Sequence, residues 1–92
     1  MSDVSVIDNA AKHRFELHAD GYVAFLNYNL RPNEMELVHT EVPKELEGRG
    51  IGGKLATAAF NIARSKNLKV KPTCPFVTSY VQRHPEYSDL IS

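Results

Sequence analysis

The first half of the chain alternates between apolar and polar residues, which is typical of half-buried β-strands. This alternation predicts strands at Val4–Asp8, Arg14–His18, Tyr22–Leu30 and Met35–Val42. The pair Asp20-Gly21 predicts a hairpin turn, and Pro43 ends the last strand of the series. Strict alternation in that strand would place Met35, Leu37 and His39 on one face and Val38, Thr40 and Val42 on the other.

The second half of the chain changes to helical periodicity. Apolar residues at helical spacing predict a helix over Ile51–Lys66, and Asn67 suits its end. A short strand at Leu68–Lys71 and a second short helix at Phe76–Arg83 follow. A right-handed crossover should then place the last strand beside the fourth. We therefore predict one α+β (α/β) domain over residues 1–92, with a mainly antiparallel mixed sheet, a central helix and a short C-terminal helix.

Composition and charge exclude several classes of protein. The 92 residues contain 11 basic and 11 acidic side chains, and this balance argues against a nucleic-acid-binding coat. No apolar run approaches the roughly 20 residues that span a bilayer, so we expect no membrane partner. The single cysteine and the absence of a signal-like start favour a cytoplasmic, intracellular location. The histidines and the cysteine show no metal-ligand spacing, so we expect no metal.

Residues 47–54 read Glu-Gly-Arg-Gly-Ile-Gly-Gly-Lys and contain four of the five glycines. Glycines just before a helix let backbone N–H groups approach a phosphate. A nucleotide P-loop would need Ser or Thr after Lys54, but residue 55 is leucine. A dinucleotide fingerprint would need a strand that ends at the first glycine and an acidic residue about 20 positions later, and both are missing.

A third template fits this loop. Glu47-Gly48-Arg49-Gly50-Ile51-Gly52 resembles the pyrophosphate loop [Q/R]-x-x-G-x-[G/A] of the GCN5-related N-acetyltransferase (GNAT) superfamily, which uses acetyl-CoA. Glu47 departs from the usual Gln or Arg. The strand and helix order also fits that superfamily's core. With His39-Thr40, Pro72-Thr73-Cys74, Tyr80-Val81 and His84-Pro85, residues 12–90 look like a minimal, single-domain acetyltransferase.

The resemblance implies a set of cofactor-binding residues. The backbone of Thr40, Glu41 and Val42 would hold the pantetheine arm, and His39 and Cys74 would lie near the thioester. The pyrophosphate would be wrapped by Arg49, Gly50, Ile51, Gly52, Gly53 and Lys54, chiefly through their amide N–H groups. Arg49 and Lys54 would add charge to the phosphates, including the ribose 3′-phosphate.

The chemistry of acetyl transfer suggests roles for four residues. An imidazole is a suitable base at neutral pH, so His39 is the candidate for deprotonating the amine. A backbone N–H near Val42 could stabilise the developing oxyanion, and Tyr80 could protonate the leaving thiolate. Cys74 could form an acyl-enzyme, line the acetyl pocket, or be a small buried apolar group. The alternatives to these catalytic roles are that Tyr80 only packs in the core and that His39 has a structural role.

We therefore expect an N-acetyltransferase that moves an acetyl group from acetyl-CoA to an amine. The alternatives are a CoA- or acyl-CoA-binding module without significant turnover and a protein-interaction domain that has kept the fold only. Larger relatives wall the acceptor site with extra N-terminal helices, whereas strands begin almost at once here. The expected open groove suits an exposed amine, such as a protein lysine, an N-terminus or a polyamine. We expect a monomer or a weak dimer.

Overall fold

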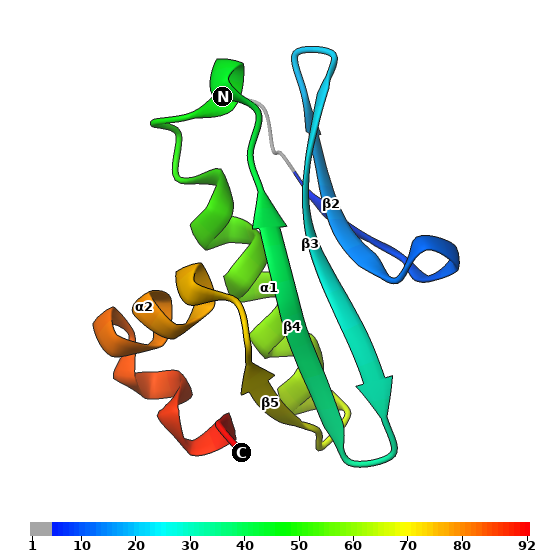
Figure 1. The fold of residues 1–92 in the computed structure, drawn as a ribbon, viewed down its shortest axis with the longest axis vertical. Helices are drawn as coiled ribbons and strands as arrows, with labels where there is room; N and C mark the ends of the chain where they lie inside the picture. Colours follow the sequence, from blue (N-terminus) through cyan, green and yellow to red (C-terminus); the bar gives the residue numbers. More distant parts are fainter. Residues whose placement is uncertain (1–4) are drawn as a thin grey trace.

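The computed structural model describes residues 5–92 and contains one five-stranded sheet with two α-helices (Figure 1). The strands are β1 (Val6–Asn9), β2 (Arg14–Ala19), β3 (Tyr22–Arg31), β4 (Glu34–Glu41) and β5 (Lys69–Pro72), and the helices are α1 (Ile51–Ser65) and α2 (Pro75–Arg83). The strand order is β1-β2-β3-β4-β5, and every neighbouring pair is antiparallel except β4 and β5. None of the helices in this part of the chain is long and apolar enough to cross a membrane.

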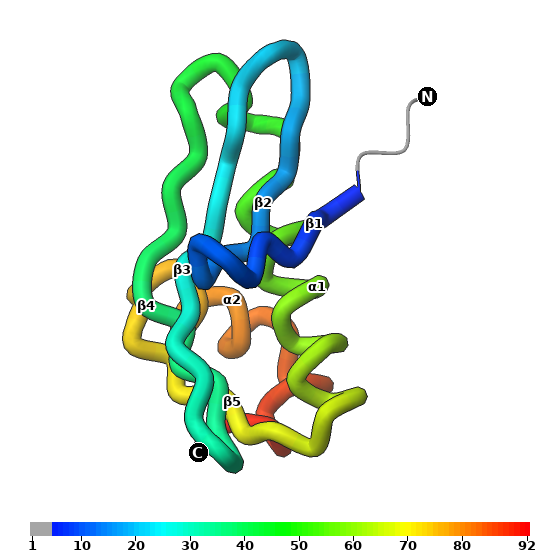
Figure 2. The backbone as a smooth tube through the Cα atoms, turned by 90° about the vertical axis from the view of Figure 1, so that its right-hand side faces the viewer, coloured from blue at the N-terminus to red at the C-terminus, as the bar shows by residue number. Residues whose placement is uncertain are grey.

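Both helices pack on one face of the sheet, and the core lies between the two layers (Figure 2). The apolar side chains of β2, β3 and β4 meet the apolar stripe of α1, in which Leu55, Ala59 and Ala63 are fully buried. From α2, Val77 and Tyr80 join the same core. This arrangement explains the helical periodicity, because only one side of α1 faces the sheet.

The predicted fold class is confirmed, and so is the parallel crossover, in which Leu37 of β4 pairs with Pro72 of β5. The predicted hairpin is present, with Asp20 and Gly21 at φ of 52° and 81°. Asn67 follows α1 in the left-handed conformation, as a helix end requires. The first strand runs over Val6–Asn9, later than predicted, and Val4 lies outside the described residues.

The predicted alternation in β4 is wrong, because the strand contains a β-bulge. Asn27 of β3 pairs with His39 and Tyr28 pairs with Leu37, so Val38 is an extra residue without a partner. Leu37 is fully buried beneath the helices, whereas the next paired residue, His39, is exposed on the other face. The bulge therefore reverses the alternation and turns Thr40, rather than His39, toward the helices.

A second irregularity separates β4 from β5. Their ladder ends at Leu37 and Pro72, and one further bond runs from the Cys74 N–H to the Leu37 carbonyl at 2.9 Å. The chain then turns into α2, while β4 continues to Glu41 beside β3 alone. The two strands thus splay apart near Thr40, which opens a gap in the sheet at this point.

The opposite face of the sheet carries no α-helix in residues 5–92 (Figure 2). Its one buried polar residue is Glu16, whose carboxylate lies 2.9 Å from His18 Nε2 and accepts bonds from Arg14 at 2.6 Å and Asn9 at 3.0 Å. The bonds to His18 and Arg14 lower the pKa of Glu16 to about 2 despite its burial. A charged network thus covers this end of the exposed sheet face.

Candidate functional site

The loop before α1 presents a row of unpaired backbone donors. Gly48 and Gly50 have φ of 82° and 70°, in the left-handed region that other residues enter only with strain. The first helical bond runs from the Lys54 N–H to the Gly50 carbonyl at 3.1 Å. Among the residues that the structure describes, the amide N–H groups of residues 48–53 have no acceptor. Six such donors at the positive end of a helix are suited to bind an anion.

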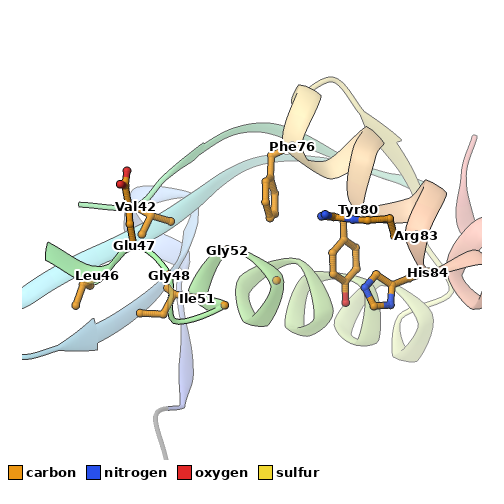
Figure 3. Close-up of a pocket in the computed structure, with 12 residues that line it drawn as sticks. Val42, Leu46, Glu47, Gly48, Ile51, Gly52, Phe76, Tyr80, Arg83 and His84 are labelled. Atoms are coloured by element: carbon orange, nitrogen blue, oxygen red, sulfur yellow. The ribbon is translucent and has the colours of Figure 1, made fainter. Parts of the chain in front are cut away.

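A groove of about 350 Å³ extends from this loop between α1 and α2 (Figure 3). It is lined by Val42, Leu46, Glu47, Gly48, Gly50, Ile51, Gly52, Gly53, Phe76, Tyr80, Arg83 and His84. Phe76 and Tyr80 point from α2 toward α1, and the two helices approach closely because Gly52 has no side chain. A Cβ atom at Gly52 would lie 2.8 Å from Cζ of Phe76. Gly52 therefore packs closely against α2 and also belongs to the row of free amide N–H groups at residues 48–53, which we call the cradle.

The gap between β4 and β5 holds a buried thiol. Cys74 is 3% exposed and directly precedes α2, and its Sγ lies 3.3 Å from Oγ1 of Thr40. Thr40 reaches this position because the bulge turns it toward the helices. The structure thus joins two predicted site residues that are 34 positions apart in the sequence.

The surroundings of Cys74 favour its thiolate. Burial raises the pKa of the thiol, but the Thr40 hydroxyl and the amide N–H groups of Val77, Phe76 and Thr40 outweigh burial, so that the pKa lies below its ordinary value. The amide N–H groups of Val77 and Phe76 belong to the first turn of α2, where the helix leaves its backbone donors without helical acceptors. The thiol is therefore more acidic than its burial alone would suggest.

His39 lies on the other side of the sheet from Cys74. Its side chain is 58% exposed, and its Nε2 lies 3.3 Å from a carboxylate oxygen of Glu41. Its ring centroid is 6.3 Å from that of Phe25 on the same face. The bulge therefore divides the predicted residues between two faces, with the thiol on the helix side and the imidazole on the uncovered side.

Tyr80 is buried between the helices and is already hydrogen-bonded. Its hydroxyl bonds to Thr57 of α1, and its ring stacks on His84 with centroids 4.2 Å apart. Tyr80 lies six positions after Cys74, about 9 Å along the axis of α2. The structure thus places Tyr80 in the wall of the groove and away from the thiol.

The two predicted cationic residues of the loop point in different directions. Nη1 of Arg49 lies 2.6 Å from Oδ2 of Asp20 at the tip of the β2–β3 hairpin, and both side chains are exposed. Lys54 is also exposed, and it lines a second groove along the outer surface of α1. Glu47 lies in the first groove. The side chains around the free amide N–H groups therefore carry charges of both signs. Most hydrogen-bond donors to an anion at this position would come from the backbone.

Sequence reasoning missed several residues of the grooves, among them Thr57, Phe76, Arg83 and His84. Phe76, Tyr80 and His84 are spaced four residues apart, so they had to share one face of a helix. That spacing was a usable signal for an aromatic wall. Within residues 5–92 no group of three His, Cys, Asp or Glu side chains could hold a metal ion.

Comparison with known proteins shows the family to which this chain belongs. Residues 14–90 match the GCN5-related N-acetyl-transferase family, and the chain belongs to that family. The NMR solution structure of a GCN5-like protein from Staphylococcus aureus has a TM-score of 0.77 and 29% sequence identity, covering 100% of this chain and 91% of that chain. The fold and the family together support an acetyltransferase.

Vertebrate relatives share part of the sequence. Protein NATD1 of Xenopus tropicalis is 41% identical over 51 residues, which is 55% of this chain and 47% of the relative. Protein NATD1 of Homo sapiens is 41% identical over 51 residues, which is 55% of this chain and 45% of the relative. Protein NATD1 of Danio rerio is 37% identical over 59 residues, which is 62% of this chain and 54% of the relative. The matches thus span about half the length of these curated relatives.

Proposed function

We propose that this protein transfers the acetyl group of acetyl-CoA to an amine. The observation that carries the proposal is the row of six free amide N–H groups at residues 48–53, which opens into the groove between α1 and α2. The row suits a pyrophosphate, because several backbone donors can share its charge without fixed counter-ions. The volume of the groove, about 350 Å³, and its apolar lining residues suit the pantetheine arm that follows the pyrophosphate.

The splay between β4 and β5 would receive the reactive end of the cofactor. β4 has no β5 partner beyond Leu37, so those backbone groups of Thr40, Glu41 and Val42 that do not bond to β3 would be available to the pantetheine amides. Val42 also lines the groove, and its N–H is our candidate oxyanion donor. When bound, acetyl-CoA supplies the activated acetyl group as a thioester.

The amine would approach from the uncovered face of the sheet. There His39 would accept the amine proton, with Glu41 holding the imidazole at 3.3 Å and stabilising the imidazolium that results. This assignment makes the bulge functional, since it directs His39 to the acceptor side and Thr40 to the cofactor side of the same gap. Because no helix of residues 5–92 covers this face, an exposed amine such as a protein lysine, an N-terminus or a polyamine could reach it.

Cys74 has two possible roles in this site. Its lowered pKa and its place at the splay support attack on the thioester, in which the sulfur would accept the acetyl group and the CoA thiol would leave. Its burial and its contact with Thr40 equally support a lining role in the acetyl pocket. Tyr80 remains our candidate for proton return to the CoA thiolate, with packing between the helices as the competing role.

Calorimetric titration with CoA and acetyl-CoA tests the cofactor, and a thiol-release assay with a lysine peptide, a free N-terminal peptide and spermidine tests turnover. We expect binding of both ligands and acceptor-dependent thiol release. Binding without release for any acceptor would instead favour the CoA-binding module, and absence of binding would refute the cradle. Mass spectrometry after incubation with acetyl-CoA distinguishes the two roles of Cys74, because only the covalent route leaves acetyl on this residue.

A matched pair of histidine variants tests the base. His39→Asn should lower kcat by about 100-fold or more with little change in CoA affinity, the range that general bases contribute. His13→Asn is the control, because His13 is an exposed residue with φ of 54°, which asparagine tolerates. Equal kcat values for the two variants would rule out His39 as the base.

A further inference from the structure

The uncovered face of the sheet holds an arginine in a fixed orientation. Nε of Arg14 lies 2.6 Å from a carboxylate oxygen of Glu16, and Cζ of Arg14 lies 4.5 Å from the centroid of the Phe25 ring. Glu16 is only 6% exposed, and its pKa of about 2 keeps the carboxylate ionised at neutral pH. An ion pair at one edge of the guanidinium and an aromatic ring against its face restrict a side chain that is otherwise flexible. Arg14 is therefore preorganised.

The other edge of this guanidinium has unused donors. Within residues 5–92, neither Nη1 nor Nη2 of Arg14 donates a hydrogen bond, and 23% of the side chain is exposed. Arg31 on the same face differs, because its two Nη nitrogens lie 3.5 Å from Glu34 and 2.9 Å from Glu36. Two parallel N–H donors match the two oxygens of a carboxylate. Arg14, unlike Arg31, can offer such donors to a ligand.

Phe25 links this arginine to the proposed base. Its ring centroid is 6.3 Å from that of His39 and 4.5 Å from Cζ of Arg14, so the guanidinium carbon lies at most about 11 Å from the centre of the imidazole. Hydrogen bonds of about 3 Å at the two ends take up more than half of that span. A molecule with its amine at His39 and an acid at Arg14 must therefore carry the two groups only a few bonds apart.

The charges on either side of Phe25 have opposite signs. Glu41, which pairs with Phe25 across β3 and β4, is 62% exposed and lies beside His39 at 3.3 Å. An α-amine has an ordinary pKa of about 7.7–8.0, so it arrives mainly as an ammonium ion at neutral pH. The ammonium group suits the side of Glu41, and a carboxylate suits the side of Arg14. The face is thus complementary to an amine that has an acid beside it.

We propose that the acceptor is an α-amine whose nitrogen lies two or three bonds from a carboxylate carbon, as in a free amino acid or an N-terminal aspartate. Arg14 binds the carboxylate through Nη1 and Nη2, and Phe25 lies between the two ends of the site. The ammonium ion first loses one proton to water. The neutral amine then forms a bond to the acetyl carbon, the bond from that carbon to the CoA sulfur breaks, one amine proton passes to His39, and CoA leaves as the thiolate. The inference rests on the proposed function and narrows it, since lysine side chains and polyamines lack a neighbouring acid.

Acceptors that differ only in one acid test this assignment. In the thiol-release assay, alanine and alaninamide test the free amino acid, and the C-terminally amidated tripeptides Asp-Ala-Ala and Asn-Ala-Ala test the N-terminus. We expect the acidic member of at least one pair to have a kcat/KM about tenfold higher, equivalent to about 1.4 kcal/mol. The pair that shows the preference identifies the source of the acid. No preference for the acid in either pair would overturn the inference.

Variants attribute the preference to Arg14. Arg14→Gln should remove it, whereas Arg31→Gln, which removes the same charge from the same face, should keep it. Because Arg14→Gln leaves the buried Glu16 carboxylate without its cation, the double variant with Glu16→Gln gives the same readout in a chain without that unpaired charge. A preference that survives in both Arg14 variants, or that Arg31→Gln also removes, would overturn the inference.

NMR spectroscopy tests binding without turnover. N-acetylaspartate carries acids at both spacings and N-acetylasparaginamide carries none, so only the former should shift the signals of the Arg14 Nε–H and the Phe25 ring. Equal shifts by both compounds, or no shift by either, would overturn the inference. The proposed function fails separately, if no amine at all gives thiol release.

Discussion

The close approach of α1 to Phe76 makes Gly52→Ala a quantitative test of the site. A Cβ atom at Gly52 would lie 2.8 Å from Cζ of Phe76, whereas carbon atoms pack best about 3.5–4.0 Å apart. Relieving this overlap should cost about 1–3 kcal/mol, as overpacking does elsewhere. Replacing a helical glycine by alanine returns about 0.5–1 kcal/mol. We therefore expect Gly52→Ala to reduce the free energy of unfolding by about 1 kcal/mol.

Gly53→Ala is the matched control in the same turn of the helix. A Cβ atom there would lie 3.6 Å from Tyr80, an ordinary contact, so this variant should gain about 0.5–1 kcal/mol. For each kcal/mol of difference in their free energies of unfolding, the Tm values of the two variants should differ by about 4–8 °C. Thermal and urea unfolding followed by circular dichroism can resolve this difference. In a Phe76→Leu background the difference should shrink, because the clashing ring atom is gone. Equal stability of the two glycine variants, or a difference that persists in that background, would refute this account of the groove.

Three further predictions follow from charges in the structure. Glu47→Gln should strengthen CoA binding about twofold. The reason is repulsion, because a like charge about 8–10 Å from a phosphate costs about 0.5 kcal/mol in water. Weaker CoA binding of the variant by calorimetry would contradict this. Thr40→Val should raise the pKa of the Cys74 thiol, which thiolate absorbance against pH measures; an unchanged pKa would mean that the Thr40 hydroxyl does not support the thiolate. The pKa of Glu16 is about 2 in the folded protein against an ordinary 4.5, chiefly through His18, so its stabilisation is complete above about 4.5 and is lost as the pH falls toward 2. Urea unfolding between those pH values should therefore show a shallower loss of stability in Glu16→Gln, and an identical slope would exclude this role.

Local sequence patterns predicted most of the elements, because their physical causes are local. The stripe through Leu55, Ala59 and Ala63 required a helix with one buried side, and the structure buries all three residues. The pair Asp20-Gly21 required a turn with two positive φ angles, and both angles are present. The glycines before α1 have no side chains, so they leave the backbone N–H groups of this loop uncovered. The residue roles assigned to that loop remain predictions.

The positions of the site residues could not be predicted in the same way. Alternation in β4 placed His39 with Leu37, but register in a sheet depends on the partner strand, and the bulge at Val38 appears only when β4 is aligned with β3. Likewise, nothing near Arg49 in the sequence indicates its ion pair with Asp20, which lies 29 residues away. Such contacts arise when separate elements pack against one core.

The sequence by itself determined the fold class and the glycine-rich loop before α1, because alternation, helical spacing and glycine conformation act over a few neighbouring residues. Only the tertiary structure decided which groups share the gap between β4 and β5. The bulge directs Thr40 to Cys74 and His39 to the uncovered face, and the packing of α2 on Gly52 shapes the groove between them. Each of these features depends on how strands and helices pair over long separations, which no local pattern encodes.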